Sequence, residues 1–366
     1  MRHVAIVGAG IFGLQLAIEL NDLGYEVDVF EEKGVILSGS TSKSLLRIHK
    51  GLHYPRHLPT AKQSLRNYNS FVERFTETVN TNFNNFYLLR EKGSKISLKE
   101  MSEFLGALKC DAEIIKLEQL AQIGINPLGV SLAVSCKEGV VDLDLLRELF
   151  ARELSCRQIR LNLNSKVLEV AQSASKWRLL GQDHELGTFD VLVLATYGNR
   201  PILSGLSSVQ PELMEYHRTL TLDVKLNIEK IGVTVIDGDF LTVLPKGFSD
   251  SYLIYGPTPS RLEVGIGTRV PESWLTSEWE DNNSVLINRA SSTLMNRVKE
   301  LFPDSEPVIS GNPLIGIRSV GVNLQTTDAR ESNVTELFHN LFEIHSGKID
   351  HCLEVSRYLG RLIDKC

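Results

Sequence analysis

The N-terminal part of the chain contains two short apolar runs, separated by a glycine-rich turn and a stretch with helical spacing. His3–Val7 is a short apolar run that leads into a glycine-rich turn beginning at Gly8, and apolar residues at helical spacing then continue over 14–23. Alternating apolar residues follow over Glu26–Phe30, and Glu31 comes directly after them. This order predicts a strand, a tight turn, a helix and a second strand, which is the opening unit of a parallel α/β domain.

Two different apolar patterns divide the rest of the chain. A nearly continuous apolar run over 189–195 predicts a buried parallel strand. Between 217 and 270 the apolar residues instead alternate with a period of two, which predicts an antiparallel sheet. Helical spacing predicts four further helices, over 60–75, 98–108, 143–154 (with Asp142 as its N-cap) and 285–301.

The pattern near the C-terminus predicts that the nucleotide-binding domain is discontinuous. A strand over 341–344, a Ser-Gly turn and a terminal helix follow the period-two region. We therefore expect a mixed α/β (α+β) fold in which an antiparallel-sheet substrate domain is inserted into a Rossmann-like domain. The nucleotide-binding domain is predicted over 1–85, 140–210 and 310–366, and the substrate-binding domain over 86–139 and 211–309.

The composition is that of an ordinary globular protein, and it narrows the classes of partner. The 366 residues carry a formal net charge of −6. No window reaches the roughly 18 uncharged apolar residues of a membrane-spanning helix. An acidic balance disfavours a nucleic-acid binder, and the N-terminus leaves no room for a targeting sequence. The five cysteines are scattered without metal-ligand spacing, so we expect reduced thiols, no metal site and a cytoplasmic location.

The glycine-rich turn carries a dinucleotide-binding fingerprint. Gly8, Gly10 and Gly13 match the GxGxxG pattern in the context it requires, after a strand and before a helix. The first glycine permits the tight turn, the second lets the backbone approach a pyrophosphate, and the third lets helix and strand pack closely. Glu31 stands where a carboxylate accepts the ribose hydroxyls. The alternative is a glycine turn in an α/β protein that binds no nucleotide.

Three features favour FAD over NAD as the nucleotide. A Ser-rich loop over 38–44 offers hydroxyls and amides to a long, buried cofactor, and the strand and turn over 189–198 provide a second approach to it. The stretch Ser-Gly-Lys-Ile-Asp at 346–350 opens the last predicted helix, whose N-terminus favours negative charge. No second GxGxxG is found, so we expect the electrons to come from the substrate and not from NAD(P)H.

Several longer stretches carry a resemblance to a known family. They are VAIVGAGIFGLQLAIEL, VDVFEEK, GVVDLDLLRELF, FDVLVLATYG, the GIR at 316–318 and NLFEIHSGKID. In these stretches the chain resembles the FAD-dependent D-amino-acid oxidase superfamily, which includes glycine and sarcosine oxidases and L-2-hydroxyglutarate dehydrogenases. The segment IHKGLHYP at 48–55 is most similar to the 2-hydroxyglutarate branch. The resemblance runs through most of the chain, but the inserted antiparallel region is too divergent to match.

The resemblance implies an extended FAD with its two ends held by distant parts of the chain. A helix N-terminus and the ammonium of Lys348 at the flavin edge would make the cofactor a better hydride acceptor. The implied contacts are Gly8, Gly10, Gly13 and Glu31 at the ADP half, Val167 at the adenine, Thr196 and Gly198 near the pyrophosphate, Ser42 and Ser44 near the pyrophosphate and flavin, and Gly347, Lys348 and Ile349 at the flavin.

Four residues are candidates for the substrate side. The resemblance implies that Arg318, at the end of a predicted strand, binds a carboxylate through two parallel hydrogen bonds. His49 aligns with the histidine of the family's IHxG pattern, and a neutral imidazole suits removal of a hydroxyl proton. His53 is a second candidate base, and Lys50 is a candidate for binding an anion or promoting reaction with oxygen. Each has a structural alternative, as a buried histidine or a surface cation.

These features predict a FAD-dependent oxidoreductase that oxidises the Cα–H bond of a small anionic carboxylate substrate, a 2-hydroxy acid or an amino acid. The electrons would pass to flavin N5 as a hydride and then to O2 or another acceptor. The alternatives are an amine or N-methyl amino acid oxidase of the same fold, and a flavin-binding protein without turnover in assembly or sensing. An aromatic-ring monooxygenase is less consistent, because it needs NAD(P)H and a late Gly-Asp segment that the sequence lacks.

Overall fold

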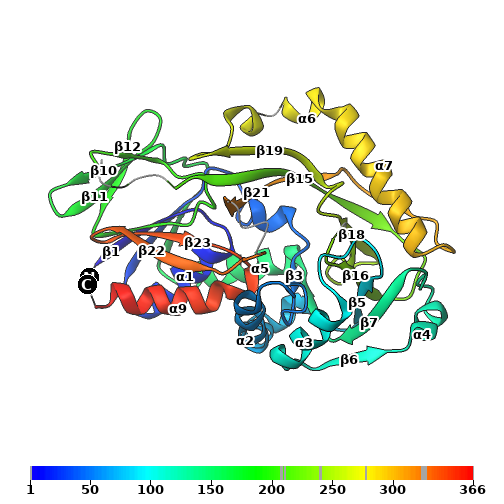
Figure 1. Ribbon diagram of the computed structural model, residues 1–366. Helices are drawn as coiled ribbons and strands as arrows, with labels where there is room; N and C mark the ends of the chain where they lie inside the picture. Colours follow the sequence, from blue (N-terminus) through cyan, green and yellow to red (C-terminus); the bar gives the residue numbers. More distant parts are fainter. Residues whose placement is uncertain are drawn as a thin grey trace.

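A six-stranded, mostly parallel sheet organises the part of the molecule that contains the N-terminal strand (Figure 1). The computed structural model describes residues 2–365 except 207–208, 210–211, 239–240, 277 and 323–327. All neighbouring strands run parallel apart from one antiparallel pair, β22 with β23. The strands lie in the order β22 (Asn333–Phe338), β23 (Leu341–His345), β13 (Val191–Leu194), β1 (His3–Val7), β2 (Glu26–Phe30) and β9 (Ile159–Asn162).

Both faces of this sheet are covered, which explains its continuous apolar strands. On one face Val4, Ile6 and Phe342 pack with helices that include the neighbours α1 and α9 (Figure 1). On the other face Ala5 and Leu192 pack against a smaller four-stranded sheet. Strands that are buried on both faces read as uninterrupted apolar runs, as β13 does. The covering elements are α1 (Ile11–Asp22), α5 (Leu143–Ser155), α9 (Cys352–Ile363), β10 (Glu169–Ser173), β11 (Lys176–Leu180), β12 (Glu185–Phe189) and β14 (Ile202–Ser204).

A second, largely antiparallel sheet forms the other half of the molecule. Its longest strand, β15 (Met214–Lys225), pairs with β19 and β21 along its first part and with β18 and β20 along its last. Helix α7 (Ser284–Leu301) packs on it through apolar residues such as Leu294. The other strands are β5 (Asn84–Arg90), β6 (Ala112–Ile115), β7 (Val130–Cys136), β16 (Ile231–Ile236), β17 (Thr242–Pro245), β18 (Ser251–Tyr255), β19 (Arg261–Gly267), β20 (Val308–Ile309) and β21 (Leu314–Gly321).

Short elements join the two halves. Helix α2 (Leu58–Arg74) packs near the start of α9, and a small sheet of three short strands lies beside it (Figure 1). The small sheet consists of β3 (Arg47–Ile48), β8 (Gly139–Val141) and β4 (Val79–Asn80). The remaining helical elements are α3 (Leu98–Leu108), α4 (Leu117–Gln122), α6 (Trp279–Asn282), η1 (Ser40–Lys43), η2 (Thr76–Thr78), η3 (Glu272–Leu275) and η4 (Ile349–His351).

The expected mixed α/β fold is confirmed, with differences at particular elements. The predicted strand over 189–195 is divided, because β12 ends at Phe189 in the smaller sheet and β13 starts at Val191 in the parallel sheet. The predicted helix over 14–23 begins earlier, at Ile11. The predicted cap at Asp142 is present, since its carboxylate accepts hydrogen bonds from the backbone amides of residues 144 and 145.

The predicted division into two domains stays a proposal. Strand β21 falls in the range assigned to the nucleotide-binding domain, yet it pairs with β15 of the antiparallel sheet. Strand β5 crosses the proposed boundary at 85/86, and the boundary at 210/211 lies outside the described residues. Among the described residues, no helix is long and apolar enough to cross a membrane.

Candidate active site

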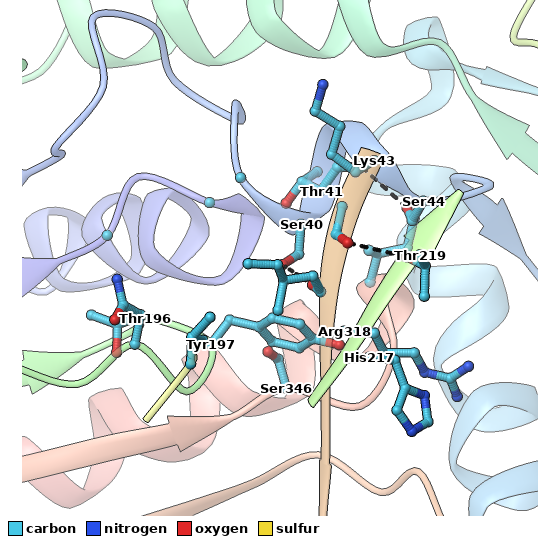
Figure 2. A pocket seen from close by; sticks show the side chains of 18 of the residues that line it. Ser40, Thr41, Lys43, Ser44, Thr196, Tyr197, His217, Thr219, Arg318 and Ser346 are labelled. Atoms are coloured by element: carbon cyan, nitrogen blue, oxygen red, sulfur yellow. Dashed lines mark hydrogen bonds between the residues drawn. The ribbon is translucent and has the colours of Figure 1, made fainter. Parts of the chain in front are cut away.

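A cavity of about 1220 Å³ lies where the two sheets meet. One wall comes from the carboxyl ends of β1, β2 and β13, where Val7, Phe30 and Ala195 line it. The other wall comes from β15 and β21, and includes His217 and Arg318 (Figure 2). The carboxyl edge of a parallel sheet is the usual ligand-binding edge in α/β proteins. The cavity is therefore the candidate site for both cofactor and substrate.

The three glycines of the fingerprint differ in what a side chain would meet. Gly8 has φ +109°, and a Cβ there would lie 2.6 Å from the carbonyl oxygen of Ala195. A Cβ at Gly13 would lie 2.0 Å from the carbonyl oxygen of Gly8, so helix α1 approaches the turn too closely for any side chain. At Gly10 the nearest atom, Oγ1 of Thr41, is 3.6 Å away. Gly10 lines the cavity, so the space beside its backbone is open to a ligand.

Glu31 closes the same end of the cavity. Its carboxylate accepts hydrogen bonds from the backbone amides of Ala9 at 2.9 Å and of Lys33 at 3.0 Å. These bonds fix the carboxylate against the glycine turn, in the cavity lining. Val167, which the resemblance implies at the adenine, also lines the cavity. It lies two residues after Ser165, whose amide donates to the carbonyl oxygen of Glu31 at 2.8 Å.

The serine-rich loop over 38–44 contributes several hydroxyl side chains to the cavity lining. Thr41 and Ser44 line the cavity, and Ser44 Oγ donates to the carbonyl oxygen of Thr41 at 3.1 Å (Figure 2). Ser40 also lines it and holds the loop to β21 by donating to the carbonyl oxygen of Ile317 at 3.1 Å. Ser42 is absent from the lining. Its hydroxyl is directed at the backbone carbonyl oxygens of residues 38 and 39, and its expected contact with the cofactor stays a prediction.

The turn after β13 places in the cavity lining one side chain whose polar atom makes no hydrogen bond with the described residues. Thr196 lines the cavity, and its buried Oγ1 has no hydrogen-bond partner among the described residues. Gly198 has φ +88°, and its carbonyl oxygen accepts from Tyr216 Oη at 3.1 Å. Gly198 is not in the lining, so it shapes the turn and does not face the cavity. Tyr197, which the sequence did not indicate, extends from this turn toward the strand that carries Arg318 (Figure 2).

The turn before η4 forms the opposite end of the cavity. Gly347, Lys348 and Ile349 all line it. The amide of Gly347 donates to Ser332 Oγ at 2.7 Å, and a Cβ at Gly347 would overlap the carbonyl oxygen of Arg330 at 1.8 Å. The Nζ of Lys348 lies 4.9 Å from the centroid of the Tyr54 ring. Burial lowers the pKa of Lys348 to about 8, while burial raises the pKa of the nearby Asp350 to about 7.

These features fit FAD, a dinucleotide long enough to reach from one end to the other. The Gly10 cradle and the unpartnered Thr196 hydroxyl lie at the pyrophosphate end, and Glu31 lies beyond them. The Lys348 turn lies at the flavin end. A buried hydroxyl without a partner costs stability unless a ligand satisfies it. The residues present therefore suit the cofactor that the sequence implies.

His49 and His53 stand on the wall near Lys348, but their geometry changes the expected chemistry of His49. His49 is buried and His53 is half-buried, and both line the cavity, with ring centroids 6.0 Å apart. Burial, followed by the charge of Lys348, lowers the pKa of each imidazole well below its usual value, so both are neutral. The amide of Gly51 donates to His49 Nδ1 at 3.3 Å. A neutral His49 therefore carries its proton on Nε2 and presents a donor, not the acceptor that a base requires.

Two arginines meet beside these histidines. Arg318 lies on β21 and its guanidinium bonds to the side chain of Tyr255. Arg330 comes from the segment before β22, and burial, then the charge of Arg318, lowers its pKa to about 10. Asp328 Oδ1 is 3.7 Å from Arg330 Nη2, and Asp328 Oδ2 is 3.3 Å from Arg56 Nη2. The charge of Arg318 thus opposes the protonation of Arg330, and two neighbouring guanidinium groups form a favourable place for an anion.

Lys50 lies apart from these arginines, and its expected role in the site stays a prediction. It is absent from the cavity lining, and its Nζ contacts Asp111 Oδ2 at 3.2 Å and lies over the Tyr68 ring. Arg47, part of the same basic segment, lines the cavity but is bound at 2.6 Å to the buried carboxylate of Glu138. The positive charges of Lys50 and Arg47 in this segment are therefore paired with carboxylates of the protein itself.

The sequence did not identify two residues that the structure adds to the site, Arg330 and Tyr197, nor Glu138, the buried partner of the cavity residue Arg47. Arg330 lies in a polar loop with no motif. Tyr197 lies between Thr196 and Gly198, the two residues of its turn that the resemblance implied near the pyrophosphate. Glu138 comes just before β8, far in the sequence from its partner Arg47. No spacing in one sequence reports such contacts, because they depend on how the two sheets meet.

Comparisons with known proteins agree with this fold. A family model described as FAD dependent oxidoreductase (DAO) matches residues 3–334. A curated FAD-dependent monooxygenase of Fusarium mangiferae is 26% identical over 244 residues, which cover 67% of this chain and 61% of that protein. The chain thus spans about three fifths of the length of this relative.

Solved structures show the same fold at low identity. The crystal structure of glycine oxidase from Geobacillus kaustophilus superposes with a TM-score of 0.71 and 16% identity, covering 100% of this chain and 94% of that one. The L-alpha-glycerophosphate oxidase of Mycoplasma pneumoniae, solved with FAD bound, superposes with a TM-score of 0.70 and 14% identity, covering 99% of this chain and 94% of that one. At these identities the likeness concerns the fold.

Proposed function

The chain belongs to the family of FAD-dependent oxidoreductases, and from this premise we propose that it oxidises the Cα–H bond of a small carboxylate substrate. The cofactor is FAD. The substrate is a 2-hydroxy acid or an amino acid, and O2 or another acceptor takes the electrons. The arrangement of Arg318 and Arg330 at one end of the cavity is the observation that carries this proposal.

The charges around these arginines support an anionic substrate. Arg56, Arg318 and Arg330 supply three guanidinium groups, and Asp237 and Asp328 supply two carboxylates that pair with Arg56 or Arg330. One positive charge remains, and Lys348, which also lines the cavity, adds positive charge that the neighbouring Asp350 partly offsets. An arginine fork binds a carboxylate with two parallel hydrogen bonds, which fixes its orientation as well as its charge.

The residues around the substrate can be assigned distinct tasks. When bound, FAD supplies the acceptor for the two electrons of the substrate. Arg318, oriented by Tyr255, binds the substrate carboxylate, and Arg330 adds positive charge beside it. His49 donates its Nε2 hydrogen to the substituent on the Cα atom, since Nδ1 is taken by Gly51. For a hydroxy acid, the neutral imidazole of His53 accepts the hydroxyl proton.

We also propose which residues hold the cofactor. Gly8, Gly10, Gly13, Glu31 and Val167 would hold the adenosine and pyrophosphate end. Thr196 and Ser44 would contact the middle, and the turn formed by Gly347, Lys348 and Ile349 would hold the flavin. The backbone shape at the glycines and the open hydroxyl of Thr196 support this assignment. The nucleotide-binding part would be the parallel sheet with its helices, and the antiparallel sheet would cover the substrate.

Anaerobic spectrophotometry of the purified, FAD-loaded protein tests the proposal. A panel of 2-hydroxy acids and amino acids is compared with the matching amides and with N-methyl amines. We expect one or more acids to bleach the flavin absorbance, and the matching amides to fail. Bleaching by amines that lack a carboxylate would favour an amine oxidase. A flavin that dithionite reduces but no substrate bleaches would indicate a binding protein without turnover.

The curated relative favours one second candidate, because it is named a monooxygenase. A monooxygenase places one oxygen atom of O2 in its product. Turnover under ¹⁸O2 distinguishes the two functions, since our proposal requires that no label enter the oxidised substrate. Labelled product would replace the proposed function with an oxygenation.

A further inference from the structure

Two of the cysteines that are scattered in the sequence lie next to one another in the structure. Cys136 ends β7, and Cys110 stands just before β6. These strands are antiparallel neighbours, with Ala112 opposite Cys136. The amide of Ala112 bonds to the carbonyl oxygen of Cys110 at 2.8 Å, so the chain turns toward Cys136 there. The two thiols hydrogen-bond to each other, and both are free.

The two thiols have different surroundings. Cys136 is 2% exposed and belongs to the core cluster around Tyr87, whereas Cys110 is partly open to solvent at the edge of that cluster. The hydrogen bond with Cys136 lowers the pKa of Cys110 more than burial raises it, and the Lys50 ammonium lowers it further. The same hydrogen bond, together with burial, raises the pKa of Cys136. One thiol is therefore accessible and disposed to ionise, and its neighbour stays protonated.

We propose that Cys110 and Cys136 form an oxidisable dithiol site that hydrogen peroxide converts to a disulfide. In the first step the Cys110 thiolate attacks one oxygen of peroxide, the O–O bond breaks, and the products are a sulfenic acid and water. In the second step the Cys136 sulfur attacks the Cys110 sulfur, the S–O bond breaks, and a second water leaves. The two thiols lose two electrons and two protons in total, and peroxide is reduced to two waters.

An accessible thiol of low pKa beside a second thiol is the arrangement found in redox-sensitive cysteine pairs. Lys50 fits this site better than the catalytic one, since its ammonium pairs with Asp111, the residue next to Cys110. The inference does not depend on the proposed function. It concerns the edge of the core cluster beside β6 and β7 and uses no residue that we place at the substrate or the cofactor.

The test treats the reduced, FAD-loaded protein with hydrogen peroxide and follows intact mass and peptide maps without reductant. We expect a loss of the mass of two hydrogen atoms and a linked Cys110–Cys136 peptide, both reversed by a dithiol reductant. Cys110→Ser should abolish the mass loss. Cys136→Ser should leave a sulfenic acid on Cys110 that dimedone traps. Cys156→Ser is the matched control, because this thiol is exposed and distant in sequence, and it should leave the disulfide unchanged.

A rate measurement tests the role of Lys50. Lys50→Met keeps a long side chain over Tyr68 but removes the charge, and we expect Cys110 to react about threefold more slowly, because its pKa is higher and less of it is thiolate. Two outcomes would overturn the inference. One is that Cys156 is oxidised while Cys110 and Cys136 stay reduced. The other is that Cys110 proceeds to a sulfinic acid in the wild-type protein with no linked peptide.

Discussion

The two ends of the cavity recognise ligands by different means. At one end, the glycine turn and Glu31 offer backbone shape and a single carboxylate, all from one strand–turn–helix–strand unit. At the other end, His49, Arg318 and Lys348 are side chains from three distant segments, and the charge of Lys348 helps lower the pKa of His49. A backbone site depends on local conformation, whereas a side-chain site depends on how the sheets meet. Substitutions at the two ends should therefore fail differently.

The largest effect is expected from Arg318→Met at the side-chain end. Removing one partner of a desolvated charge pair costs about 2–5 kcal/mol, so kcat/KM for the carboxylate substrate should fall about 100-fold or more. The flavin should stay bound, because Arg318 lies away from the glycine turn. Steady-state kinetics and the flavin-to-protein absorbance ratio measure the two effects. Arg361→Met, on the exposed face of α9, is the control. An unchanged kcat/KM would remove Arg318 from the substrate site.

At the backbone end, Gly10→Ala and Gly13→Ala form a matched pair. A Cβ at Gly13 has no room beside the Gly8 carbonyl, so this variant should lose about 1–3 kcal/mol of unfolding free energy. A Cβ at Gly10 meets nothing closer than 3.6 Å, so Gly10→Ala should keep the stability of the apoprotein and lose affinity for FAD. Chemical denaturation and FAD titration of the apoproteins measure both. Equal FAD affinity in Gly10→Ala and wild type would contradict the cradle.

Glu31→Gln tests the single carboxylate of the backbone end. A hydrogen bond to a charged group contributes about 1.5–3 kcal/mol, so we expect FAD to bind about tenfold more weakly, with little change in kcat for the loaded enzyme. Glu32→Gln is the matched neighbour, because within the described part of the chain its carboxylate forms ion pairs with Lys33 and Lys166 and not with the glycine turn. If both variants retain FAD equally, the carboxylate of Glu31 has no part in binding it.

A pH profile sharpens the view of the side-chain end. The pKa of Lys348 is lowered to about 8, so its positive charge is lost as the pH rises through that value. If that charge attracts the substrate, kcat/KM should fall about tenfold between pH 7 and pH 9, as one group of this pKa requires. The histidines, whose pKa values are lowered well below the usual range, should add no loss between pH 7 and pH 6. Lys348→Met should flatten the alkaline limb, and the same limb in that variant would assign it elsewhere.

The sequence was most informative where the structure is local. The strand, turn, helix and second strand around Gly8 follow from apolar spacing and backbone requirements within one short segment, and Glu31 could be placed from its position after β2. The turn at Lys348 was identified through its resemblance to a family. The structure brings both turns to one cavity.

The sequence was least informative where two distant segments decide the chemistry. Lys50 was suggested for the active site by its charge and its position in the IHKG segment, but its ammonium contacts Asp111. His49 was expected to be a base, and a single backbone hydrogen bond from Gly51 changes which ring nitrogen carries the proton. Arg330 reaches the cavity from a loop without any pattern. Register, tautomer and the direction of a side chain are properties of packing, and periodicity does not encode them.

The hydrogen bonds of the buried Glu138 carboxylate limit which substitutions this chain can accept in evolution. Glu138 is 1% exposed and accepts hydrogen bonds from Arg47, from the backbone of Lys50, from Tyr87 and from Asn85. No one of these positions can change alone without leaving a charge or a donor unpaired in the interior. Among homologous sequences, positions 47, 85, 87 and 138 should therefore covary, and a lineage that replaces the glutamate should have exchanged its arginine as well.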